Sequence, residues 1–166
     1  MIKQSSVILL LVGLTFSLTG CFEAPSWVYE GASVVEFKNP RAGFTTQPAN
    51  NAVNVIRART IRQGIGRDSI LVQMVGPQRP TPTTVGYIVA GTSTAVEGVN
   101  YNIVGTKGSI VIPANSSSAF IVLQLLSGIP TTAPATQTVS LAMTLTGGDT
   151  TPPSENYKTF TFTIRN

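Results

Sequence analysis

Two stretches near the C-terminus alternate large apolar residues with small, mostly polar ones, and this alternation restricts the fold more than any other feature of the sequence. A period of two is typical of a β-strand with one face buried and the other toward solvent. It predicts antiparallel strands over residues 139–145 and 157–164. The inward positions are Val139, Leu141, Met143 and Leu145 in the first strand and Phe160, Phe162 and Ile164 in the second.

Shorter β-branched runs precede these two segments, and each ends at Gly, Pro or Asn. Thr, Val and Ile supply 52 of the 166 residues, while charged residues make up only 11%. No segment after the first twenty residues shows a helical period. The pattern predicts an all-β, immunoglobulin-like antiparallel sandwich of seven or eight strands. The additional strands are expected at residues 33–37, 53–61, 69–75, 83–90, 108–113 and 119–126.

The first twenty residues read as a targeting segment. Lys3 supplies a positive charge, an apolar run follows from Val7 to Leu14, and Leu18, Thr19 and Gly20 precede Cys21. The run is shorter than the roughly 18 residues that a membrane span needs. The segment resembles a bacterial lipoprotein signal peptide with its lipobox at Leu18, Thr19 and Gly20.

This resemblance implies cleavage before Cys21 and covalent attachment of diacylglycerol and an N-acyl chain, such as palmitate, to that residue. Two or three acyl chains hold a protein on a membrane where one does not. Phe22 in place of an inner-membrane retention Asp favours the outer membrane, and Glu23 favours its cell-surface side over the periplasmic side. The expected organisation is a signal peptide at 1–20, a lipidated tether at 21–32 and a β-sandwich at 33–166.

The residue types present exclude most catalytic chemistry. The chain has no His and one Cys, so Ser/His/Asp triads, His-ligated zinc and CxxC redox motifs are absent. No motif marks a nucleophile or an opposed pair of carboxylates. We therefore expect a protein that is not an enzyme and holds no cofactor beyond the lipid on Cys21.

One region resembles a known module. Residues 91–101, Gly-Thr-Ser-Thr-Ala-Val-Glu-Gly-Val-Asn-Tyr, precede Gly-Ser-Ile-Val-Ile-Pro at 108–113 and a hydrophobic strand. This arrangement is similar to the Calx-β module, and the phrase from Ser154 to Phe160 resembles small Calx-β-like lipoproteins of Bacteroidota. The resemblance implies a sandwich used for binding or as a spacer. On physical grounds Gly98 suits a turn with positive φ, and Tyr101 is expected to pack over the end of the sandwich.

Calcium binding, which some Calx-β modules show, is not expected here. Asn100 stands where the family usually has Asp, and the acids Glu36, Asp68, Glu97 and Asp149 are scattered. Ca²⁺ takes six to eight oxygen ligands, usually with several converging carboxylates. We predict no metal site.

Four arginines fall within eleven residues: Arg57, Arg59, Arg62 and Arg67. Arg57 and Arg59 would project from the same face of a strand. Two interpretations stay open, namely protection of a sheet edge and contact with lipopolysaccharide, an acidic glycan or an acidic protein surface. Both place the arginines on the surface, so replacing Arg57, Arg59 and Arg62 by Ser is expected to leave the melting temperature nearly unchanged.

Two functions remain. The first is an accessory lipoprotein that docks through its sandwich on an outer-membrane protein complex. The second is a surface module that binds glycan or another polymer in association with a TonB-dependent uptake system, with Trp27, Tyr29 or Tyr87 as stacking rings. Nucleic acid is not an expected partner, because the aromatic interleaving of an RNA platform is missing.

Overall fold

The computed structural model describes residues 31–39, 57–134, 136–148 and 150–166, and β-strands joined by turns and loops make up this part of the chain. The predicted Cys21, lipobox, Trp27, Tyr29 and Asp149 lie outside the described residues. Among the described residues, no helix is long and apolar enough to cross a bilayer. The nine strands are β1 (Val34–Lys38), β2 (Ala58–Arg62), β3 (Arg67–Val75), β4 (Thr83–Val89), β5 (Tyr101–Val104), β6 (Ser109–Ile112), β7 (Ser118–Leu125), β8 (Thr138–Gly147) and β9 (Thr159–Arg165).

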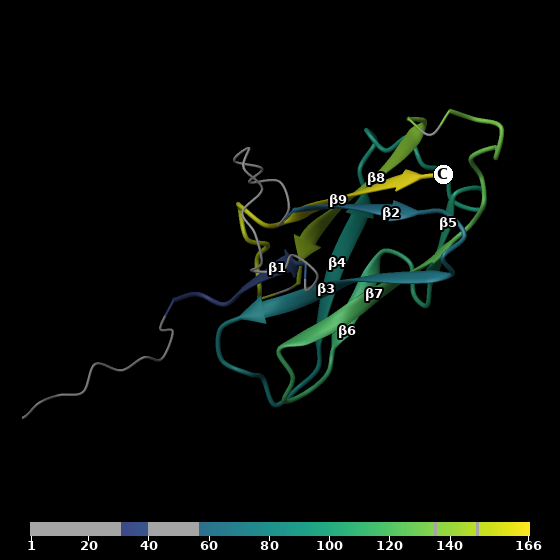
Figure 1. Ribbon diagram of the computed structural model, residues 1–166. Helices are drawn as coiled ribbons and strands as arrows, with labels where there is room; N and C mark the ends of the chain where they lie inside the picture. Colours follow the sequence, from purple (N-terminus) through teal and green to yellow (C-terminus); the bar gives the residue numbers. More distant parts are fainter. Residues whose placement is uncertain (1–30, 40–56, 135, 149) are drawn as a thin grey trace, which may run out of the picture.

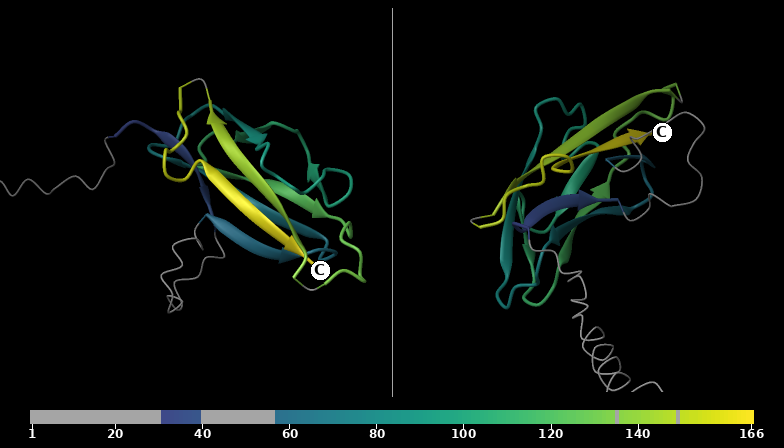
Figure 2. Two further views of the ribbon diagram at one scale, coloured as in Figure 1. Left: turned by 90° about the horizontal axis from the view of Figure 1, so that it is seen from above. Right: turned by 90° about the vertical axis from the view of Figure 1, so that its left-hand side faces the viewer.

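The strands form two sheets that face each other as the layers of a sandwich (Figures 1 and 2). The first sheet has the order β1-β3-β7-β5, and the second has the order β2-β9-β8-β4-β6. The predicted all-β sandwich is thus confirmed. The strand number is nine rather than seven or eight, because β5 was not among the expected strands.

One strand pair departs from the predicted antiparallel arrangement. β2 runs parallel to β9, with Arg62 beside Arg165. Parallel neighbours need a long connection, and here nearly the whole domain lies between the two strands. The other pairs within the two sheets are antiparallel.

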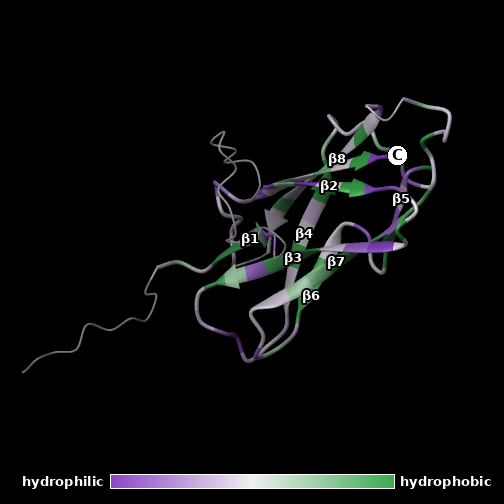
Figure 3. Ribbon diagram, viewed as in Figure 1, coloured by the Kyte–Doolittle hydropathy of each residue, from purple (hydrophilic) through white to green (hydrophobic). Residues whose placement is uncertain are grey.

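The core lies between the sheets and follows the alternation of the sequence. In β9 the inward residues are fully buried and the threonines between them are partly exposed. The rings of Phe160 and Phe162 meet edge to face with centroids 5.0 Å apart, and Phe37 of β1 lies 6.2 Å from Phe160. Such pairs add to the free energy gained by burial. Figure 3 shows β3 with separate hydrophilic and hydrophobic segments along one strand.

The turn before β5 forms as the sequence indicates. Gly98 has a φ of +81°, a conformation that glycine adopts without steric cost. Asn100 is buried, and its side-chain oxygen accepts a hydrogen bond from the backbone N–H of Val96 at 2.8 Å. Tyr101 is also buried, which confirms its expected packing role. These residues close the end of the sandwich.

The contrast between two phenylalanines tests this core. Phe160→Ala removes a fully buried ring and should lower the free energy of unfolding by about 3–5 kcal/mol. Phe120→Ala, at a ring that is 52% exposed, should change it by less than about 0.5 kcal/mol. Urea denaturation followed by circular dichroism measures both. Equal losses would contradict the assignment of inner and outer faces.

Candidate functional site

The four clustered arginines do not form one surface, which corrects the sequence-based expectation. β2 alternates, so Arg59 and Ile61 point into the sandwich while Thr60 and Arg62 point out. Arg57 is exposed and donates a hydrogen bond from Nη1 to the backbone oxygen of Asn156 at 3.0 Å. Arg67 is exposed at the start of β3, in the other sheet.

Arg59 belongs to the interior. Its Nη2 lies 3.0 Å from Asp68 Oδ1 and donates to the backbone oxygen of Ser69 at 2.6 Å. Nη1 donates to Asn39 Oδ1 at 3.2 Å. The side chains of Arg59 and Asp68 are 9% and 0% exposed. The pair therefore joins β2 of one sheet to β3 of the other.

Two aromatic rings complete the surroundings of Arg59. Its Cζ lies 5.2 Å from the ring centre of Phe162 and 6.0 Å from that of Phe160. Both distances fall within the range of a cation–π interaction. The prediction that Ser at positions 57, 59 and 62 would spare the melting temperature assumed that all three arginines lie on the surface, whereas position 59 holds a buried ion pair.

Arg62 instead lies beside Arg165, a residue that the sequence analysis did not select. The two residues are register partners in the parallel pair of β2 and β9, and both are exposed. The signal in the sequence was a repeated tripeptide, Thr60-Ile61-Arg62 and Thr163-Ile164-Arg165. Parallel pairing sets these tripeptides side by side, with isoleucines inward and arginines outward. We call Arg62 and Arg165 the arginine pair; Figure 3 shows both strands ending in hydrophilic colour beside the C-terminus.

Hydroxyl groups cover the outer face of the sheet next to the arginine pair. Thr60 is the register partner of Thr163, and Thr163 is that of Ser140 in β8. The oxygen of Thr94 Oγ1 lies 3.3 Å from Ser140 Oγ. We call these four residues the hydroxyl row. A hydroxyl both donates and accepts, so the row can meet polar groups of either kind.

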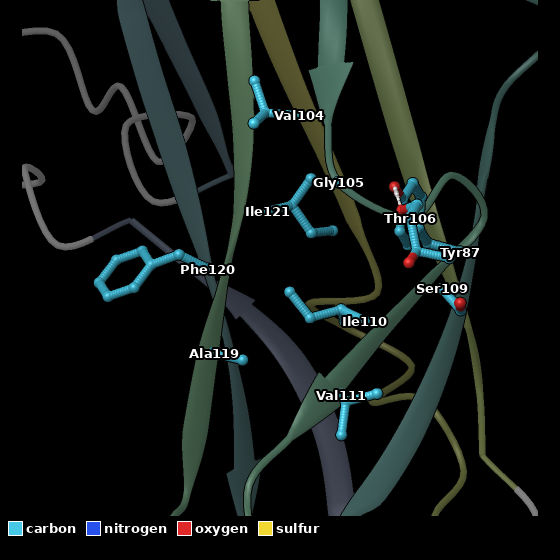
Figure 4. A pocket seen from close by; sticks show the side chains of 10 residues that line it. All are labelled: Tyr87, Val104, Gly105, Thr106, Ser109, Ile110, Val111, Ala119, Phe120 and Ile121. Carbon is cyan, nitrogen blue, oxygen red and sulfur yellow. Dashed lines mark hydrogen bonds between the residues drawn. The ribbon is translucent and has the colours of Figure 1, made fainter.

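A different surface opens at the far edge of the sandwich, between β6 and β7 (Figure 4). β5 ends at Val104, and beyond it a cavity of about 360 Å³ separates the two strands. Ile110 and Ile121 point into this space, whereas Phe120 points to the outside. Phe120, Val111 and Val104 are 52%, 52% and 40% exposed. We call this surface the apolar groove, lined by Val104, Ile110, Val111, Ala119, Phe120 and Ile121.

Tyr87 does not offer a stacking ring, which corrects another expectation. It lies on the inward side of β4, is 3% exposed, and its hydroxyl donates to the backbone oxygen of Thr106 at 3.2 Å. Burial raises the pKa of the Tyr87 hydroxyl above its ordinary value. The ring is a core element of β4.

The described carboxylates lie apart from one another. Glu97 pairs with Lys107 at 2.9 Å, and this hydrogen bond lowers the pKa of Glu97. Asp68 pairs with Arg59, while burial raises the pKa of Glu36 on β1. Within the described ranges, no three His, Cys, Asp or Glu residues gather as a metal site would require.

Comparison with solved structures gives the class of fold. The apo form of the Calx CBD1 domain superposes with a TM-score of 0.55 at 15% identity, over 81% of this chain and 97% of that one. The calcium binding domain CBD12 of CALX1.1 matches with a TM-score of 0.51 at 16% identity. A two-domain protein of unknown function from Bacteroides fragilis matches with a TM-score of 0.52 at 9% identity. The chain therefore has a Calx-β-like sandwich fold.

The extent of these matches differs. The chain spans 41% of the CBD12 structure and 45% of the Bacteroides protein, so it corresponds to a part of each. No protein-family model matches the sequence, and no curated protein does. At these identities the likeness concerns the fold alone.

The buried ion pair gives a direct test. Asp68→Asn leaves Arg59 buried without its carboxylate and should lower the free energy of unfolding by about 3 kcal/mol or more. Arg62→Gln, at an exposed position of the same strand, should change it by less than about 0.5 kcal/mol. Denaturant titration measures both variants.

A double variant separates pairing from packing. Arg59→Met combined with Asp68→Leu removes both charges and should recover more than half of the loss caused by Asp68→Asn alone. The single variants Arg59→Met and Asp68→Leu are measured for comparison. If the double variant loses as much free energy of unfolding as these two single variants lose when added together, a paired, buried Arg59 is contradicted.

Proposed function

We propose that the protein is a non-catalytic lipoprotein, anchored through Cys21 in the outer membrane and facing the cell surface, that docks through its sandwich on an outer-membrane protein complex. The lipobox-like residues before Cys21 support the anchor. The scattered carboxylates and the lack of His support the absence of catalysis. The observation that carries docking is the apolar groove with its unpaired strand edges.

The hydrogen-bond pattern of β7 shows which of its backbone groups face the groove. The N–H of Met74 in β3 donates to the oxygen of Ser117, so alternate backbone groups from Ser117 onward point toward β3. The groups between them point toward β5, whose last partner is Val122. The N–H and C=O of Phe120 therefore face the groove, where no strand of the described chain continues β5.

The edge of β6 is open in the same way. The N–H of Tyr87 in β4 donates to the oxygen of Gly108, which directs the backbone of Ile110 toward β4. The backbone of Val111 then points away from β4, because neighbouring residues alternate. The groove thus offers unpaired backbone edges together with exposed apolar side chains.

The occupant that fits is an extended segment of a partner protein. Such a segment pairs its backbone with a free strand edge and places every second side chain in an apolar pocket, which is the recognition mode of strand addition. Unprotected edges favour association with other chains. Ile110 and Ile121 form the pocket floor for an apolar side chain of the partner.

A surface module for glycan or another polymer, beside a TonB-dependent transporter, is the second candidate. The outer face with its hydroxyl row favours it. Of its expected stacking rings, Tyr87 is buried, while Trp27 and Tyr29 lie outside the described residues.

Docking at the groove is tested with Phe120→Lys and Val111→Lys. Each puts a charge where the partner's apolar side chains would lie, and the double variant should lose a partner that co-purifies stoichiometrically from detergent extracts. Thr159→Lys, at an exposed position of β9 that does not line the groove, is the control and should keep it. Retention of the partner by the groove variant, with the fold intact by circular dichroism, would refute docking there.

The anchor is tested separately with Cys21→Ser. The variant should fail to incorporate radiolabelled palmitate and should leave the membrane fraction, because the acyl chains supply the attachment. Labelling of the native protein and not of the variant is the expected result. An unlabelled native protein in the cytosolic fraction would contradict the proposal.

A further inference from the structure

The arginine pair places two like charges on adjacent strands. Residues in register on neighbouring strands lie about 4.8 Å apart, and like charges at such positions destabilise a sheet. Within the described ranges, neither guanidinium has a carboxylate within 4 Å. Like charges at in-register positions disfavour a sheet, and a bound anion would offset this effect.

The described side chains next to the pair carry no negative charge. Asn166 follows Arg165, and its side-chain Oδ1 accepts a hydrogen bond from Gln63 Nε2 at 2.9 Å. Thr138 is the register partner of Arg165 on β8, and it is neutral. Asp68 is on the inner side of the sandwich with Arg59.

We propose that Arg62 and Arg165 form a binding site for an oxyanion, and that the ligand is an acidic polysaccharide. Each guanidinium presents a planar set of donors that matches a carboxylate or phosphate group. Two of them side by side can hold one such group between them. This site is on the outer face of the sheet and does not depend on docking at the apolar groove.

The hydroxyl row favours a sugar chain over a free small anion. Thr60 and Thr163 are the next outward residues before the arginine pair on their strands, and Ser140 and Thr94 continue the row across the sheet. Hydroxyl groups donate to and accept from sugar hydroxyls. An anionic group on the arginine pair would thus place the neighbouring sugars along the row.

Binding of oligogalacturonate to the full-length protein in detergent micelles tests the proposal, with a neutral malto-oligosaccharide of equal length as the uncharged probe. The double variant Arg62→Gln, Arg165→Gln should weaken oligogalacturonate binding by about tenfold or more, since it removes both charged donors. The control Arg57→Gln, Arg67→Gln removes the same net charge elsewhere and should weaken binding by less than about threefold.

Deacylated lipopolysaccharide in the same assay distinguishes the source of the anion, since its charges include phosphates. Arginine-pair dependence for this probe alone assigns the site to phosphate, and dependence for oligogalacturonate alone assigns it to carboxylate. The proposal is overturned if the arginine-pair variant and the control variant weaken binding equally. It is also overturned if neither oligogalacturonate nor deacylated lipopolysaccharide binds the native protein.

Thermal melting separates binding from a structural role. The variant Arg62→Gln, Arg165→Gln should melt at the native temperature or above it, because it removes a repulsion. A saturating anionic probe should raise the melting temperature of the native protein and not that of the variant. A variant that melts well below the native protein would show that the arginines hold the sheet together, and the proposal would fail.

Discussion

The ion pair between Arg59 and Asp68 links the two sheets, and it helps to set which residues of β2 point into the sandwich and which point outward. A buried guanidinium needs a carboxylate and further acceptors, which Asp68, Ser69 and Asn39 supply. With Arg59 inward, the period of two sends Arg62 outward. A shift of β2 by one residue would bury Arg62 and expose Ile61, so the ion pair and the core select the same register.

Parallel pairing of β2 with β9 has a second consequence. It sets two copies of the tripeptide Thr-Ile-Arg in register although 103 positions separate them, so the inner face gains two isoleucines and the outer face gains two arginines and two threonines. The same pairing thus contributes to the core and creates the arginine pair. The outer face of this sheet is polar and cationic at one end, whereas the groove at the β6 edge is apolar, so the two surfaces suit different ligands.

Strand alternation in the sequence was sufficient to predict the class of fold and the inner residues of β8 and β9, such as Leu141 and Phe162. It was not sufficient for β5, because a four-residue strand after a loop carries too few residues to show a period. The arginines were misjudged for a physical reason. Charge alone indicates a surface, whereas the neighbours that bury Arg59 come from β3 and β9. Tyr87 was misjudged as well, since an isolated tyrosine in a β-branched run fits either face.

The placement of the arginine side chains is most directly tested by the solvent exchange of their Nε–H groups, measured by nuclear magnetic resonance on the native protein. The account predicts slow exchange for Arg59, which is enclosed by Asp68 and two phenyl rings, and fast exchange for Arg62 and Arg165 on the outer face. Fast exchange at Arg59, or slow exchange at both Arg62 and Arg165 without ligand, would contradict it.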